Sequence, residues 1–132
     1  RMKVLCQNAL TLAKALEELA GITVNYPGLE SSPYKPLVDK QFGGLGGAIL
    51  TIRAGSREKA FKLINSLKYA HIATNIGDLR TLVIHPSSTI YLHSTKEEQE
   101  HAGVYEDTIR ISVGIEDVED LIADFTQAIE NI

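Results

Sequence analysis

The chain has 132 residues, a net charge of −4 from 13 Lys and Arg against 17 Asp and Glu, and one cysteine. This acidic balance, without a basic stripe interleaved with aromatic residues, argues against a nucleic-acid-binding surface. No apolar run approaches the roughly 20 residues of a membrane span and no signal peptide is visible, so we expect a cytoplasmic protein without membrane contact. The length suits one core, which predicts a single domain over residues 1–132. Because the chain begins at Arg1 rather than Met, we expect a fragment of a larger protein.

Hydrophobic periodicity and turn residues predict ten elements. In chain order they are a helix over 2–20, a strand over 22–26, a short helix over 32–43, a strand over 48–53, a helix over 56–67, strands over 71–74 and 81–84, a short helix over 94–103, a strand over 108–113 and a helix from about 117. Some adjacent strands are joined too briefly for a parallel crossover. The expected class is therefore α+β, with a small, mostly antiparallel sheet and helices packed on one face.

The predicted helix starts depend on capping residues. Ser32 before a proline and Ser56 before an apolar-periodic run are typical N-caps. Ser94 and Glu97 have the spacing of a capping box. The acidic residues between Glu116 and Asp120 suit the first turn of the last helix, where negative charge is favourable, and they lack the spacing of a calcium loop. Phe61 is expected to face the core with its apolar neighbours.

The strand over 108–113 places one arginine on its own face. Strict alternation puts Ile109 and Ile111 toward the core and Arg110 on the opposite side. A guanidinium on a rigid strand can bind a carboxylate through two parallel hydrogen bonds, and it keeps its charge. The alternative is an ordinary exposed arginine on the open face of a sheet.

Other reactive residue types give weaker signals. Cys6 lies in an apolar helical stretch without an activating histidine, which indicates a buried, inert side chain. His85 is expected to support the turn into Pro86 rather than to act as a base. The four histidines have no metal-ligand spacing, so no metal site is expected. The glycines between Gly43 and Gly47 indicate a tight connection rather than a phosphate loop.

Three blocks resemble one enzyme family. They are Asn-Ile-Gly-Asp at 75–78, Thr-Leu-Val-Ile-His-Pro at 81–86, and Ile-Arg-Ile-Ser-Val-Gly-Ile-Glu-Asp at 109–117. With the Tyr-Pro-Gly-Leu turn at 26–29, they resemble the C-terminal domain of the pyridoxal-phosphate-dependent enzymes of cysteine and methionine metabolism, which have fold type I. The resemblance covers nearly the whole chain and implies that this chain is the C-terminal small domain of such an enzyme.

The resemblance implies roles for two residues. Arg110 matches the arginine that binds the α-carboxylate of the amino-acid substrate, and Asn75 occupies a position beside the cofactor and that carboxylate. Many lyases and cystathionine synthases of the family have serine where this chain has Asn75, so the asparagine resembles the O-acetylhomoserine sulfhydrylases. Ile90 and Tyr91 stand where the family commonly has threonine and histidine. Ile90 is expected to remove a hydrogen bond and to narrow the pocket.

The resemblance also implies what the chain lacks. Pyridoxal phosphate would be held mainly by a larger upstream domain, and no lysine here matches the motif of the Schiff-base lysine. The isolated chain should have no catalytic residue and no activity. The parent would be a homotetrameric transferase acting on O-acetyl-L-homoserine with sulfide or a thiol. The alternatives are a fragment of a methionine γ-lyase or of a cystathionine γ-synthase or lyase, and a non-catalytic binding module that reuses this domain.

Overall fold

Five strands form one sheet in a computed structural model that describes residues 1–132, with the order β1-β2-β5-β4-β3. The strands are β1 (Thr23–Asn25), β2 (Ile49–Arg53), β3 (His71–Ile72), β4 (Leu82–Ile84) and β5 (Thr108–Ser112). The helices are α1 (Met2–Glu17), α2 (Lys35–Phe42), α3 (Arg57–Ser66), α4 (Lys96–His101) and α5 (Val118–Glu130), with a 3-10 turn at Pro86–Ser88. The predicted α+β class is confirmed. No helix of the chain combines the length and apolar character that crossing a membrane requires.

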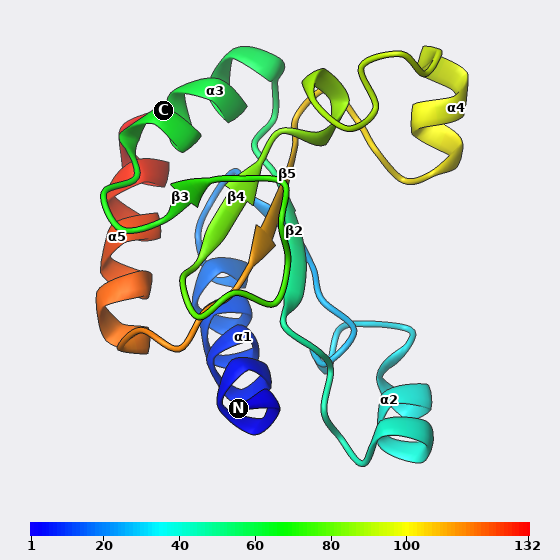
Figure 1. Cartoon of the computed structure of the whole chain (residues 1–132), viewed down its shortest axis with the longest axis vertical. Helices are drawn as coiled ribbons and strands as arrows, with labels where there is room; N and C mark the ends of the chain where they lie inside the picture. Colours follow the sequence, from blue (N-terminus) through cyan, green and yellow to red (C-terminus); the bar gives the residue numbers. More distant parts are fainter.

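Helix α5 packs against both α1 and α3, and these three helices cover one face of the sheet (Figure 1). Helices α2 and α4 stand apart from them, on two projections at the other side of the molecule in this view. The core is a cluster of 20 buried apolar residues. Leu50 and Ile52 of β2 and Ile109 and Ile111 of β5 are all at most 1% exposed within it. Their spacing of two residues is the reason that one face of these strands is apolar.

The sheet is mixed rather than wholly antiparallel. β1, β2, β5 and β4 pair antiparallel, but β3 runs parallel to β4, with His71 opposite Leu82. We expected strands with short connections to pair antiparallel. That expectation was wrong for β3 and β4, because a loop without a helix joins these two parallel strands. Residues 73–81 make this connection, and β3 is a two-residue strand at the edge of the sheet.

Several predicted boundaries need correction. α1 ends at Glu17 rather than at residue 20, and α2 begins at Lys35, because the hydroxyl of Ser32 accepts the amide of Tyr34 in a turn before the helix. The capping box joins Thr95 and Glu98, one residue beyond the predicted pair, whereas the cap at Ser56 is confirmed.

Two side chains differ from the sequence-based expectation. Phe61 was expected to face the core, and the burial of Asp124 was not predicted. Phe61 is 37% exposed, while Leu63 takes the buried position. Asp124 is buried at 3% exposure on the inner side of α5, and its carboxylate accepts the backbone amides of Lys68 and Tyr69. Asp124 therefore supplies hydrogen-bond acceptors for two backbone amides of the segment after α3. Without it these amides would lack a partner within the protein.

Candidate functional site

Arg110 lies on the face of the sheet that α1, α3 and α5 leave uncovered. The strand register places it directly opposite Thr51 of β2 on one side and Ile84 of β4 on the other, and Thr51 is opposite Asn25 of β1. Directly opposed residues share a face of the sheet. The predicted orientation of Arg110, away from the helix-packed core, is confirmed.

The Arg110 face is not open along its whole length, however. Thr108 and Ser112, two residues before and after Arg110 on the same face, are 3% and 0% exposed. The Thr108 hydroxyl accepts the amide of Tyr105, and the Ser112 hydroxyl accepts the amide of Gly77. Loops before β5 and after β3 therefore cover both sides of Arg110, which leaves the arginine in a recess rather than on an open surface.

The Arg110 guanidinium is held by backbone carbonyls and has no carboxylate partner. Its Nη2 donates to the carbonyl oxygen of Thr74 at 2.8 Å and, more weakly, to that of Asn75 at 3.4 Å. Its Nε is sealed from solvent without a hydrogen-bond partner. Burial lowers the pKa of Arg110 from its ordinary value, since desolvation penalises the charged form. The arginine is thus a partly buried cation that this chain does not neutralise.

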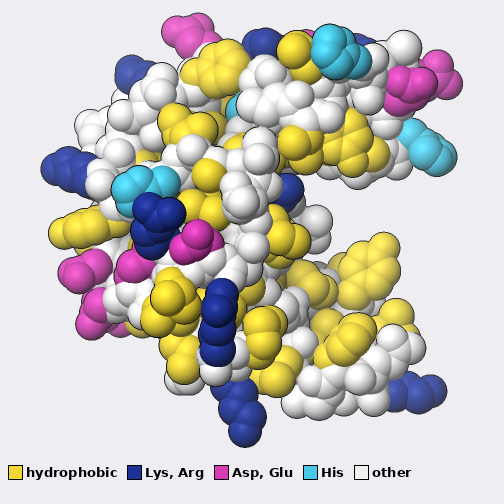
Figure 2. Space-filling view, in the orientation of Figure 1, with side chains coloured by type: hydrophobic (Ala, Val, Ile, Leu, Met, Phe, Trp, Pro, Cys, Tyr) yellow, Lys and Arg dark blue, Asp and Glu magenta, His cyan; other side chains and the backbone are white.

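A cavity of about 280 Å³ adjoins Arg110. Its floor is the polar row of Asn25, Thr51 and Arg110, and its other wall comes from the segments on either side of α4, including Ile90. No acidic or lysine side chain lines it. The surface is visibly hollowed between the two projections (Figure 2). The cavity therefore carries one positive charge among neutral groups, which favours a small anionic ligand.

Asn75 lies next to Arg110 through the backbone rather than through side chains. Its carbonyl accepts the 3.4 Å bond from Arg110, and its side chain is exposed without a hydrogen bond within the chain. Ile90, 50% exposed, lines the cavity beside Arg110 and offers no hydrogen bond there. The structure therefore places Ile90 and Arg110 around one cavity, whereas Asn75 adjoins Arg110 through its backbone and does not line that cavity.

Histidine and cysteine positions are structural. His85 is 3% exposed, with Nδ1 at 2.7 Å from the hydroxyl of Ser88 and Nε2 at 2.6 Å from the carbonyl of Glu106. It joins the turn after β4 to the loop before β5, as expected for a supporting residue. Cys6 is buried. No group of three or more potential metal ligands occurs in the chain.

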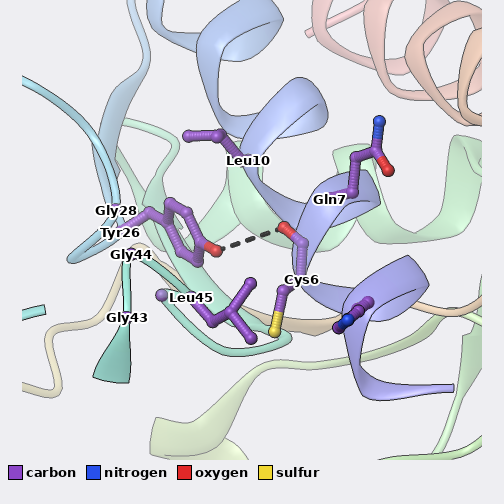
Figure 3. A pocket seen from close by; sticks show the side chains of 10 residues that line it. Cys6, Gln7, Leu10, Tyr26, Gly28, Gly43, Gly44 and Leu45 are labelled. Carbon is purple, nitrogen blue, oxygen red and sulfur yellow. Dashed lines mark hydrogen bonds between the residues drawn. The ribbon is translucent and has the colours of Figure 1, made fainter. Parts of the chain in front are cut away.

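Two other cavities do not share the character of the Arg110 recess. One, of about 340 Å³, is lined by basic and acidic side chains together, since Glu100, Glu106 and Asp107 accompany its cations, and Arg53 already donates to Asp107 at 2.9 Å. The other, of about 400 Å³, lies between the start of α1 and the glycine-rich segment 43–46. Figure 3 shows Tyr26 directed at the backbone carbonyl of Cys6. The Tyr26 hydroxyl also donates to the carbonyl of Gly47 at 2.8 Å, and burial raises the pKa of Tyr26 to about 12.

The residues of this chain do not form a pyridoxal phosphate site by themselves. A Schiff base needs a lysine amine at the site, and no lysine lines the cavity beside Arg110. Lys35, the one lysine of intermediate exposure, donates to Asp39 at 2.6 Å. The cavity beside Arg110 therefore presents a cation for a ligand and has no lysine that could hold this cofactor covalently.

Relatives with established names match the chain along nearly its whole length. The homocysteine synthase of Schizosaccharomyces pombe is 46% identical over 98% of this chain, and O-acetyl-L-homoserine sulfhydrylase 1 of Thermus thermophilus is 43% identical over 93%. The L-methionine gamma-lyase of Fusobacterium nucleatum is 40% identical over 100%. The matches cover 31%, 30% and 34% of these relatives. The chain thus spans about a third of the length of the curated relatives it matches.

Two solved structures share the fold of this chain. A Campylobacter jejuni crystal structure named as an O-acetylhomoserine (thiol)-lyase, which contains N′-pyridoxyl-lysine-5′-monophosphate, superposes with a TM-score of 0.94 at 37% identity, over 98% of this chain and 31% of that one. The O-acetylhomoserine sulfhydrylase of Wolinella succinogenes gives a TM-score of 0.80 at 34% identity, over 97% and 33%. The fold of this chain therefore corresponds to about a third of each of these larger proteins.

The family model described as "Cys/Met metabolism PLP-dependent enzyme" matches residues 1–130. This match includes both the apolar core and the recess with Arg110. Pyridoxal phosphate is the cofactor of that family. The chain belongs to the pyridoxal-phosphate-dependent enzymes of cysteine and methionine metabolism.

Proposed function

We propose that this chain is the C-terminal, substrate-binding domain of a longer O-acetyl-L-homoserine sulfhydrylase, and that Arg110 binds the α-carboxylate of the amino-acid substrate. One observation carries the proposal. Arg110 is a partly buried cation beside a cavity of about 280 Å³, and no carboxylate of the chain pairs with it. A partly buried charge without a counter-charge is costly, and a bound carboxylate offsets that cost.

The geometry of Arg110 suits a carboxylate in particular. Its bond to the Thr74 carbonyl uses one Nη2 hydrogen and fixes the plane of the guanidinium. Because Nε is sealed from solvent, the other hydrogens of Nη1 and Nη2 are the donors left for a planar, two-oxygen ligand, which the fork of an arginine can bind through parallel hydrogen bonds. Arg110 would thereby orient the substrate with respect to the part of the enzyme that performs the chemistry.

Asn75 is the second proposed substrate contact. Its exposed amide has no partner in the chain, and its backbone lies within hydrogen-bond reach of Arg110. An amide can donate to a carboxylate oxygen beside the guanidinium. The pair would then recognise the carboxylate from two directions, with Arg110 supplying charge and Asn75 supplying a directed donor.

The proposed reaction is the replacement of the acetate of O-acetyl-L-homoserine by sulfide, which gives homocysteine and acetate. The homocysteine synthase and sulfhydrylase relatives support it, together with asparagine rather than serine at position 75. The second candidate is a methionine γ-lyase, because lyases of that name are 40% identical to this chain. The residues around Arg110 bind a carboxylate in either reaction, so they do not separate the two.

A product assay of the intact enzyme that contains this chain separates the candidates. With O-acetyl-L-homoserine and sulfide we expect homocysteine and acetate, and with L-methionine we expect little turnover. Formation of 2-oxobutyrate, ammonia and methanethiol from L-methionine, without homocysteine in the first assay, would move the function to a lyase. No product from either substrate in a cofactor-loaded enzyme would favour the non-catalytic binding module.

A further inference from the structure

Residues 74–77, here called the strap, lie across the end of β5 beside Arg110. The amide of Ala73 donates to the carbonyl of Val83, and the strap begins after this last bond to the sheet backbone. The backbone groups of the strap form hydrogen bonds with side chains. Arg110 donates to the carbonyls of Thr74 and Asn75, and the amide of Gly77 donates to the hydroxyl of Ser112 at 3.0 Å. The remaining bond to the strap is from the exposed side chain of Arg1 to the carbonyl of Gly77.

The two contacts with β5 follow from the pleat of the strand. Arg110 and Ser112 are two residues apart, so both side chains project from the same face. The strap runs past them and meets Arg110 near its beginning and Ser112 at its end. Ser112 is 0% exposed, and its bond from Gly77 is part-buried. Asn75 lies between the two attachment points with its side chain free.

We infer that Ser112 is a positioning residue for substrate binding, which acts by holding the strap that in turn fixes Arg110 and Asn75. This rests on the proposed role of Arg110 in carboxylate binding. If Ser112 lost its hydroxyl, the Gly77 amide would lose its buried partner, and the strap would keep one attachment to β5 instead of two. The carbonyl of Thr74, which sets the plane of the guanidinium, would then be less well fixed.

Gly77 adds a conformational reason for the role of Ser112. Its φ of +73° lies in the left-handed region, and this turn directs its amide toward Ser112. Glycine adopts that region without steric cost but also leaves it freely. The hydroxyl of Ser112 therefore restricts a residue that has little intrinsic preference for the observed turn.

The test uses the intact enzyme and two competitive probes that differ only in a carboxylate, L-norvaline and 1-aminobutane. In Ser112→Ala we expect the inhibition constant of norvaline to rise about fivefold, which corresponds to ~1 kcal/mol, and that of 1-aminobutane to stay unchanged. Arg110→Ala should raise the inhibition constant of norvaline further. In the double variant Ser112→Ala should add less than its full effect, because the residue acts in part through Arg110.

Ser56→Ala is the matched control. Ser56 also accepts one backbone amide, from Lys59 at 3.2 Å, but it caps α3 and does not contact the strap. Its loss should lower the melting temperature and leave both inhibition constants unchanged. Equal weakening of both probes in Ser112→Ala, or a full effect that persists in the Arg110→Ala background, would overturn the role of Ser112. An unchanged norvaline constant in Ser112→Ala, with a raised one in Arg110→Ala, would overturn only this inference. An unchanged constant in Arg110→Ala would overturn the proposed function itself.

Discussion

Arg110 donates a 2.8 Å hydrogen bond to the carbonyl oxygen of Thr74, which lies 36 residues earlier in the chain. The bond connects β5 to the loop after the edge strand β3, and it orients a guanidinium that no carboxylate neutralises. An arginine fixed by a neutral carbonyl keeps its full charge for a ligand. An arginine paired with an aspartate, such as Arg53 with Asp107, does not.

Substitution of Arg110 should therefore act on substrate binding. In the intact enzyme we expect Arg110→Ala to lower kcat/KM for O-acetyl-L-homoserine about a hundredfold, since truncation of one partner of a close charge pair costs ~2–5 kcal/mol. Arg110→Lys should be intermediate, because an ammonium keeps the charge but not the planar fork. Steady-state kinetics measure both, with Arg57→Ala as an exposed arginine control. Equal kinetics of Arg110→Ala and Arg57→Ala would rule out the assigned role.

Tyr26 should make stability depend on pH in the alkaline range. Its pKa is 10.0 in the ordinary case and about 12 in the folded protein, chiefly because of burial. The unfolded chain therefore loses this proton first, so the contribution of Tyr26 to stability is fully present below pH 10.0 and is lost as the pH rises toward about 12.

Urea unfolding at several pH values tests the Tyr26 prediction. The free energy of unfolding of the unchanged protein should fall more steeply over this range than that of Tyr26→Phe. At neutral pH, Tyr26→Phe should cost ~1 kcal/mol, since the carbonyl of Gly47 loses its buried donor. Tyr26→Phe removes one titratable group and leaves the rest of the sequence unchanged, so the difference between the two curves isolates Tyr26. Parallel curves would mean that the phenol is not shielded from solvent.

Gly114 should not tolerate a side chain. A Cβ there would lie 2.6 Å from the carbonyl carbon of Arg80 and would also overlap the carbonyl of Leu79 and the carboxylate of Glu116. Glu116 cannot move freely, because it accepts the amide of Thr81 at 2.8 Å. We expect Gly114→Ala to lower the free energy of unfolding by ~2–3 kcal/mol, as overpacking of a buried site does.

Gly21→Ala provides the comparison for Gly114. Gly21 has a φ of +80° and open space around its position, so alanine meets backbone strain without a collision. The expected cost is ~1 kcal/mol. Chemical denaturation of both variants separates the two causes. A smaller effect at Gly114 than at Gly21 would show that the loop around Leu79 yields easily.

Asp124 should be a strong determinant of stability despite its charge. Its carboxylate accepts the amides of Lys68 and Tyr69, both at 2.9 Å, and a side-chain bond from Gln127. We expect Asp124→Ala to cost ~2–4 kcal/mol in thermal or urea unfolding, since two backbone donors lose their partner. Asp120→Ala, an exposed residue of the same helix, should cost well under half as much. A similar small cost for both would indicate that water replaces the carboxylate.

The apolar faces of the long helices and the alternation in β5 are local properties, and so they could be read from the sequence. The period of two alone places Arg110 opposite to Ile109 and Ile111, as the structure confirms. Helix α5 likewise begins at Val118, after the cap at Asp117 and close to the predicted start, because its acidic first turn and apolar stripe are contiguous in the chain.

The contacts that complete the site join residues far apart in the sequence. Ser112 meets Gly77 across 35 residues, and Asp124 meets Lys68 across 56. The sequence around a serine or an aspartate does not show whether a backbone amide from a distant loop will donate to its side chain. The parallel pairing of β3 with β4 was missed for the same reason, since a two-residue strand has too little pattern to indicate its direction.

The sequence by itself determined the class of the fold, the buried faces of its elements and the orientation of Arg110, because periodicity acts within a few residues. The sequence motifs were also sufficient to identify the family. Only the tertiary structure decided that Arg110 lacks a counter-charge, that Thr74 fixes it and that Ser112 holds the strap. Those properties depend on which distant groups the closed chain brings within hydrogen-bond distance, and no local pattern encodes that meeting.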